Sequence, residues 1–72
     1  MSRITLVIIP GPGAQIVEIS ENTTVQNLID QNNISGRDII VNGVGVQPSE
    51  YATTVLAENA EVFATGSVKG NG

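Results

Sequence analysis

The sequence predicts a small α+β domain in which a mixed sheet of four to five strands packs on one helix. Two strand-like segments open the chain on either side of a Pro-Gly turn, one segment with helical periodicity follows, and three more strand-like segments come after it. A chain of 72 residues can form one domain around a single hydrophobic core. We expect that domain to span residues 1–66, and residues 67–72 to form a flexible glycine tail.

The first two segments predict a β-hairpin. Residues 3–9 (RITLVII) have two largely apolar faces, one with Ile4, Leu6 and Ile8 and the other with Thr5, Val7 and Ile9. Such a strand is typical of the middle of a sheet. Residues 10–13 (PGPG) cannot extend a ladder, so we expect them to form a four-residue turn. Residues 14–20 (AQIVEIS) then form the second strand, with Ile16 facing outward.

A change of hydrophobic period marks the one predicted helix, residues 25–32. Val25, Leu28 and Ile29 fall at i, i+3 and i+4, which places them on one helical face. Thr24 precedes them as a plausible N-cap, because its hydroxyl can accept a hydrogen bond from a free backbone N–H. The helix should therefore pack on the sheet through this one face.

The second half of the chain is expected to complete the sheet. Residues 39–41 and 44–46 predict two short strands, and the Asn-Gly pair between them favours a tight hairpin turn. Ser49 could then cap one helical turn. Val55 and Leu56 are the apolar residues expected to hold this segment on the core.

The last strand is predicted at residues 60–66 (AEVFATG). A hairpin, a helix and three further strands in this length favour a sheet wrapped on one helix, with the first and last strands adjacent and parallel in its middle. That arrangement is the β-grasp, or ubiquitin-like, fold. If Val62 and Ala64 face the helix, Phe63 lies on the opposite face beside Val7 and Ile9 of the first strand. We interpret Val7, Ile9 and Phe63 as a candidate protein interface, unless Tyr51 or the tail covers Phe63.

Composition excludes several classes of function. The chain has no Cys and no His, and its acidic residues are scattered singly, so we expect neither a metal site nor catalytic side chains. Seven acidic residues against three basic ones give a net charge of -4, which disfavours nucleic acid and anionic membranes as partners. The opening MSRITLVIIP lacks a small-residue cleavage pattern, so no signal peptide is expected. The predicted location is the cytoplasm, or an assembled particle.

A group of motifs lies along residues 24–70. A helix starts at Thr-Val (24–25), a strand runs into Val-Asn-Gly (41–43), the stretch PSEYATTVL follows (48–56), and Glu-Val (61–62) begins the last strand. In these motifs, over about two thirds of its length, the chain resembles the bacterial sulfur-carrier proteins of thiamin and molybdopterin synthesis, the ThiS and MoaD group. The resemblance implies the same β-grasp fold.

The resemblance also implies a role for the end of the chain. In that family an activating enzyme adenylates the terminal glycine carboxylate, which is then converted to a thiocarboxylate. Here the acyl group would be Gly72, preceded by Gly70 and Asn71, and a partner enzyme would use ATP and a sulfur donor. The family ends in Gly-Gly because a tail without side chains can enter a narrow channel, whereas Asn71 is the penultimate residue of this chain.

Two functions follow as expectations. With Asn71 in place of glycine, the favoured one is a non-enzymatic, ThiS-like protein-binding module without a bound cofactor. Such a module would dock to a larger assembly as a structural or decoration subunit or as a regulator. The alternative is a sulfur carrier that forms a C-terminal thiocarboxylate for thiamin or molybdopterin-type biosynthesis.

Overall fold

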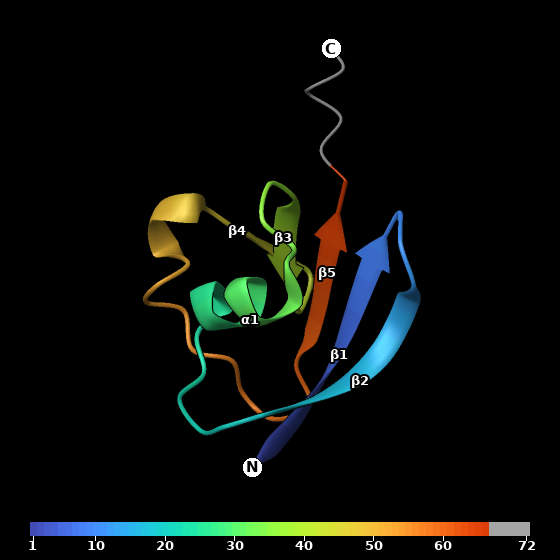
Figure 1. The fold of residues 1–72 in the computed structure, drawn as a ribbon. Coiled ribbons are helices and arrows are strands. Elements are labelled where there is room, and N and C mark those ends of the chain that lie inside the picture. Colours follow the sequence, from blue (N-terminus) through green and yellow to red (C-terminus); the bar gives the residue numbers. More distant parts are fainter. Residues whose placement is uncertain (67–72) are drawn as a thin grey trace.

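A five-stranded mixed sheet with a helix against one face forms the body of the protein (Figure 1). The computed structural model describes residues 1–66. In chain order the elements are β1 (Ser2–Ile9), β2 (Gly13–Ile19), α1 (Val25–Asn32), β3 (Asp38–Val41), β4 (Val44–Val46), the 3-10 helix η1 (Pro48–Glu50) and β5 (Glu61–Thr65). The strands lie in the order β2-β1-β5-β3-β4. β1 and β5 are parallel neighbours at the centre, which confirms the predicted β-grasp fold.

The helix has the predicted bounds because its ends are set by local chemistry. The Thr24 side chain accepts a hydrogen bond from the Asn27 N–H, and the Asn27 side chain accepts one from the Thr24 N–H, each at 3.2 Å. This reciprocal capping box satisfies two backbone donors at the helix start. At the other end Asn33 adopts a left-handed conformation with φ of 56°, which asparagine tolerates.

The core lies between α1 and the sheet. It consists of Ile, Leu, Val and Ala side chains: Ile4, Leu6, Ile8, Ile19, Val25, Leu28, Ile29, Ile34, Ile39, Leu56, Ala60, Val62 and Ala64. The alternate residues of β1 and β5 supply its sheet side, as their period of two requires. The other residues of these two strands are consequently directed to the sheet face away from α1.

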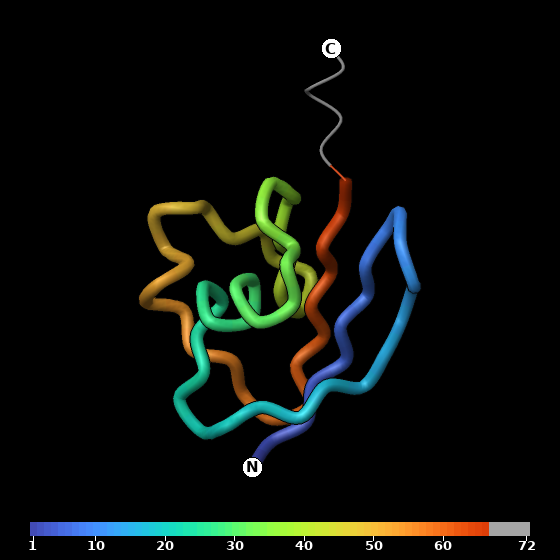
Figure 2. Tube along the Cα trace, in the orientation of Figure 1, coloured from blue at the N-terminus to red at the C-terminus, as the bar shows by residue number. Residues whose placement is uncertain are grey.

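The segment between η1 and β5 connects the far side of the sheet to its centre. Figure 2 shows the chain running from η1 below α1 before it enters β5. Backbone hydrogen bonds attach it to the start of the helix, with the Val25 N–H donating to the Thr54 C=O (2.9 Å) and the Leu56 N–H donating to the Thr23 C=O (2.8 Å). This attachment leaves the opposite sheet face clear of the segment.

Three details of the sequence prediction are wrong. β2 begins at Gly13, so the hairpin turn comprises residues 10–12 and is one residue shorter than expected. Ser49 lies inside η1 rather than at its cap, which is Gln47, and Gln47 makes no side-chain capping bond. Val55 is 55% exposed, because the extended backbone around it turns Leu56, and not Val55, toward the core.

Candidate functional site

One row of residues crosses all five strands on the sheet face that lies away from α1. At its centre Phe63 of β5 pairs with Val7 of β1 on one side and with Ile40 of β3 on the other. The row continues to Ala14 of β2 beside Val7, and to Gly45 of β4 beside Ile40. Because paired residues of neighbouring strands share a face, these five positions form one continuous strip.

The middle of this strip is apolar and accessible. Val7, Ile40 and Phe63 are each partly buried by their strand neighbours. Ile9 lies in the neighbouring row, where it pairs with Thr65 and is 50% exposed. Ile16 lies in the row on the opposite side of the strip, where it pairs with Thr5 and is 66% exposed. We call Val7, Ile9, Ile16, Ile40 and Phe63 together the open-face patch.

The structure brings two of the three predicted interface residues into direct register. Val7 and Phe63 are paired, whereas Ile9 lies one row further along β1. The sequence prediction did not include Ile40, which lies between Ile39 and Val41 in β3. The period of two assigns it to the face opposite the buried Ile39, so the alternation could have identified it.

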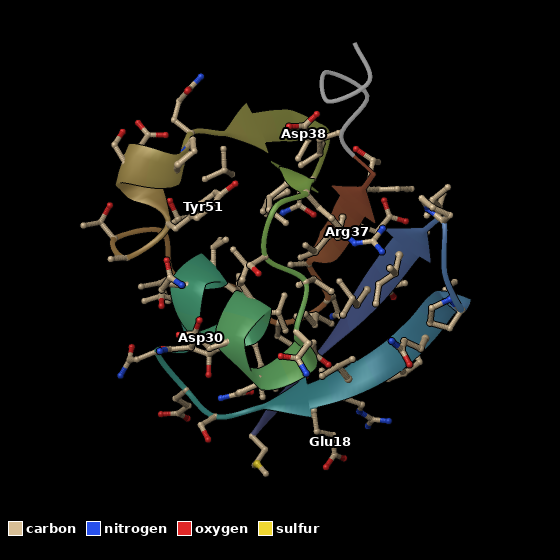
Figure 3. The ribbon with its side chains drawn as sticks, turned by 45° about the horizontal axis from the view of Figure 1, so that its top comes forward. Glu18, Asp30, Arg37, Asp38 and Tyr51 are labelled. Atoms are coloured by element: carbon tan, nitrogen blue, oxygen red, sulfur yellow. The ribbon has the colours of Figure 1, made fainter. Side chains whose placement is uncertain are left out.

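Tyr51 does not cover Phe63. It packs against the buried core, and Figure 3 shows it beside η1 on the side of the sheet that carries the helix. Within residues 1–66, therefore, the alternative that Tyr51 covers Phe63 is wrong. The alternative that the tail covers Phe63 concerns residues 67–72, which lie outside the described residues.

Charged side chains border the patch. Glu61 lies two residues before Phe63 on β5, and Asp38 lies two residues before Ile40 on β3, so both are on the open face. On the same face, toward the β2 edge, Arg3 of β1 pairs with Glu18 of β2. The border thus carries three carboxylates and one guanidinium, which makes the surroundings of Phe63 negative.

A hollow of about 260 Å³ opens next to the patch. Its lining includes Ile16 and Thr5 on the sheet and Glu58 and Asn59 in the turn before β5, with Arg3 beside them. It combines two apolar residues, Ile4 and Ile16, with groups of both charges.

A second hollow, of about 530 Å³, lies between β3, β4 and η1. Arg37, Asp38 and Tyr51 contribute to its lining (Figure 3). Burial raises the pKa of the Tyr51 phenol above its usual 10.0, and the negative charge of Asp38 raises it further. At neutral pH the phenol therefore keeps its proton and can donate a hydrogen bond. The Arg37 Nη1 is buried without a hydrogen-bond partner in the described part of the chain.

Among residues 1–66, no three acidic side chains gather closely enough to hold a metal ion. Across the same residues, none of the helices has the length and apolar character needed to cross a membrane. The tail residues Gly70, Asn71 and Gly72 lie outside the described residues.

No protein-family model matches the chain, and no curated protein matches it.

Proposed function

We propose that this β-grasp domain is a non-enzymatic protein-binding module that docks to a larger assembly through its open-face patch, as a structural or decoration subunit or as a regulator. The position of Phe63 carries the proposal. It is the one Phe of the chain, yet it lies at the centre of the open face, while the described core is built from aliphatic side chains. An aromatic side chain gains most free energy when it is fully buried, and a partner surface would complete that burial.

The composition of the open face supports the same proposal. A sheet face that is exposed to water normally carries polar residues. Here Val7, Phe63 and Ile40 are instead adjacent on three central strands. Contiguous apolar groups with a polar border are typical of interaction sites. The chemistry of the border indicates a partner with an apolar pocket for Phe63 and with basic residues opposite Glu61 and Asp38.

The sulfur-carrier function implied by the family resemblance is the alternative. It depends on Gly72 as the acyl group, on ATP and a sulfur donor, and on a partner enzyme that accepts Asn71 beside it. Incubation with an activating enzyme of the family, ATP and sulfide tests it by intact mass. A gain equal to replacing one carboxylate oxygen by sulfur, lost when Gly72 is deleted, would establish the carrier.

The docking proposal is tested with Phe63→Ser. Immobilised wild-type protein should retain its partner from an extract of the source cells, and the partner is then purified and titrated by calorimetry. We expect Phe63→Ser to weaken that binding by a factor of about 30 or more, as for a central aromatic residue of an interface. The circular dichroism spectrum should stay unchanged, because Phe63 is outside the core cluster.

Val44→Ser is the matched control. Val44 is 66% exposed and pairs with Val41 on the sheet face opposite to Phe63. Its replacement removes a similar exposed apolar group and should leave the affinity unchanged. Equal binding by wild-type protein and Phe63→Ser would refute docking through the open-face patch.

A further inference from the structure

The two edges of the sheet differ in how well they are protected. β4 forms one edge; it has three residues and is followed closely by Pro48 of η1. β2 forms the other edge; it has seven residues, contains neither Pro nor Lys, and carries one charged side chain, Glu18. Short strands, prolines and lysines are the usual means of preventing edge-to-edge pairing. The β2 edge therefore remains available for another strand.

The backbone hydrogen bonds of β1 show which groups of the hairpin are already used. The Asn59 N–H donates to the Arg3 C=O (2.7 Å), and the Thr5 N–H donates to the Ala60 C=O (2.9 Å). Arg3 and Thr5 thus direct their backbone groups toward the β5 side. Because successive residues of a strand alternate in direction, Leu6 directs its N–H and C=O toward β2.

The same alternation determines the free edge of β2. Leu6 pairs with Gln15, so Gln15 uses its backbone groups within the hairpin. Ala14, Ile16 and Glu18 alternate with Gln15 along the strand, and their N–H and C=O groups consequently point away from β1. These three residues form the free edge, and within residues 1–66 β2 pairs with β1 alone.

We propose that two copies of this chain associate through their β2 edges, antiparallel, with Ile16 opposite Ile16 of the second copy. This pairing places Ala14 of each copy opposite Glu18 of the other. All three free-edge residues of each copy then exchange backbone bonds, about six hydrogen bonds in total. The result is one continuous sheet that runs through both copies around a two-fold axis.

The strand sequence favours a second copy in this register. A shift that centres the pairing on Glu18 places two carboxylates opposite each other, which is repulsive. A shift that centres it on Ala14 brings Pro12 into the ladder, where it has no N–H to donate. The register centred on Ile16 avoids both problems, because Glu18 faces the small, neutral Ala14.

Side-chain packing contributes in the same register. Ile16 pairs with Thr5 within the hairpin, so it lies on the open face, where it is 66% exposed. Opposite its counterpart it would form a β-branched cross-strand pair at a separation of about 5.5 Å between Cα atoms. Figure 3 shows Glu18 projecting away from the body of the domain.

Sedimentation velocity over a range of concentrations tests the proposal. An interface of one strand pair is at the small end of specific interfaces, so we expect dissociation constants of roughly 10 μM to 1 mM. The wild-type protein should change from monomer to dimer as its concentration rises through that range. Ile16→Lys, which adds a charge to the edge without touching the core, should remain a monomer at the highest concentration.

The controls separate this association from other properties. Val44→Lys places the same charge at an equally exposed position, 66%, on the opposite edge strand, and it should dimerise as the wild type does. Phe63→Ser should also dimerise, because the edge pairing is independent of docking through the open-face patch. Loss of partner binding and loss of self-association are therefore distinguishable.

Amide hydrogen exchange of the wild type gives a result that does not depend on a variant. With rising concentration, exchange should slow at Ala14, Ile16 and Glu18, while Gln15 and Val17 are already protected within the hairpin. A protein that stays monomeric at about 1 mM, with fast exchange at the three free-edge amides, would overturn the proposal. So would a dimer in which Ile16→Lys associates as strongly as Val44→Lys.

Discussion

Asn42 and Glu61 are joined by two hydrogen bonds across the sheet. The Asn42 N–H donates to the Glu61 C=O at 2.8 Å, and the Glu61 N–H donates to the Asn42 side-chain carbonyl at 2.9 Å. Asn42 occupies the β3–β4 turn with φ of 50°, and Glu61 is the first residue of β5. One asparagine therefore forms the turn and also aligns the start of the strand that carries Phe63.

We expect two substitutions of Asn42 to separate these roles. Asn42→Gly keeps the left-handed backbone accessible and removes one hydrogen bond, so it should lower the free energy of unfolding by about 1 kcal/mol. Asn42→Ala should cost about 1–2 kcal/mol more, because alanine resists positive φ. Urea unfolding with an unchanged m-value provides the measurement.

Asn33→Gly is the control for the change to glycine, since Asn33 has a similar φ of 56° at the helix end. Asn33→Gly has the same entropic effect on the unfolded chain as Asn42→Gly, but it removes no hydrogen bond to Glu61. The account of Asn42 is wrong if Asn42→Gly and Asn33→Gly lose the same stability.

Gly66 has no room for a side chain. A Cβ at this position would lie 2.7 Å from Cδ of Pro10, and the rigid proline ring cannot move aside. The Gly66 N–H also donates to the Ile9 C=O, which holds the two segments together. We expect Gly66→Ala to lower the free energy of unfolding by about 1–3 kcal/mol.

Thermal unfolding measures this effect, and Gly45→Ala is its control. A Cβ at Gly45 meets nothing within 4 Å, so that substitution should leave the melting temperature unchanged or raise it slightly. For a domain of this size we expect Gly66→Ala to lower the melting temperature by roughly 4–8 °C per kcal/mol. Equal melting temperatures for the two variants would contradict the contact with Pro10.

Tyr51 should titrate above the usual pH range of a tyrosine. Burial and the nearby Asp38 raise its pKa above 10.0, and the absorbance of tyrosinate reports it directly because the chain has one Tyr and no Trp. Asp38→Asn should lower this pKa, whereas Asp30→Asn, on the exposed face of α1, should leave it unchanged. An unchanged pKa in Asp38→Asn would contradict the contribution of Asp38.

The same pKa shift predicts a direction for stability. Above pH 10 the unfolded chain loses the Tyr51 proton before the folded protein does. The contribution of the neutral phenol is therefore complete below pH 10 and is lost as the pH rises through the folded pKa. Asp38→Asn should make this loss smaller, as measured by urea unfolding at neutral and alkaline pH.

Local features were predictable because neighbouring residues determine them. The bounds of α1 follow from the Thr24 cap, the spacing of Val25, Leu28 and Ile29, and the left-handed Asn33. The Asn-Gly turn between β3 and β4 has positive φ at both residues, as such hairpins require. The hairpin turn was predicted less accurately. Gly13 pairs with Ile8 and belongs to β2, whereas its place in the PGPG stretch predicted that it belongs to the turn.

The candidate site depends more on the tertiary structure. Alternation within β1 and β5 was sufficient to place Val7 and Phe63 on the open face. The same alternation assigns Ile40 to the open face, but its place beside Phe63 depends on the register of β3 against β5, which joins residues more than twenty positions apart in the chain. Tyr51 was a possible cover for Phe63 until the path of residues 51–56 along α1 placed it on the other side.

By itself, the sequence determined the fold class, the helix and the faces of the central strands, because periodicity, caps and turn residues act over a few positions. Only the tertiary structure decided which rows of residues meet across the sheet, which edge is unprotected and which backbone groups point outward. Those properties depend on strand order and register, and these are set by the packing of the whole core rather than by any local stretch of chain.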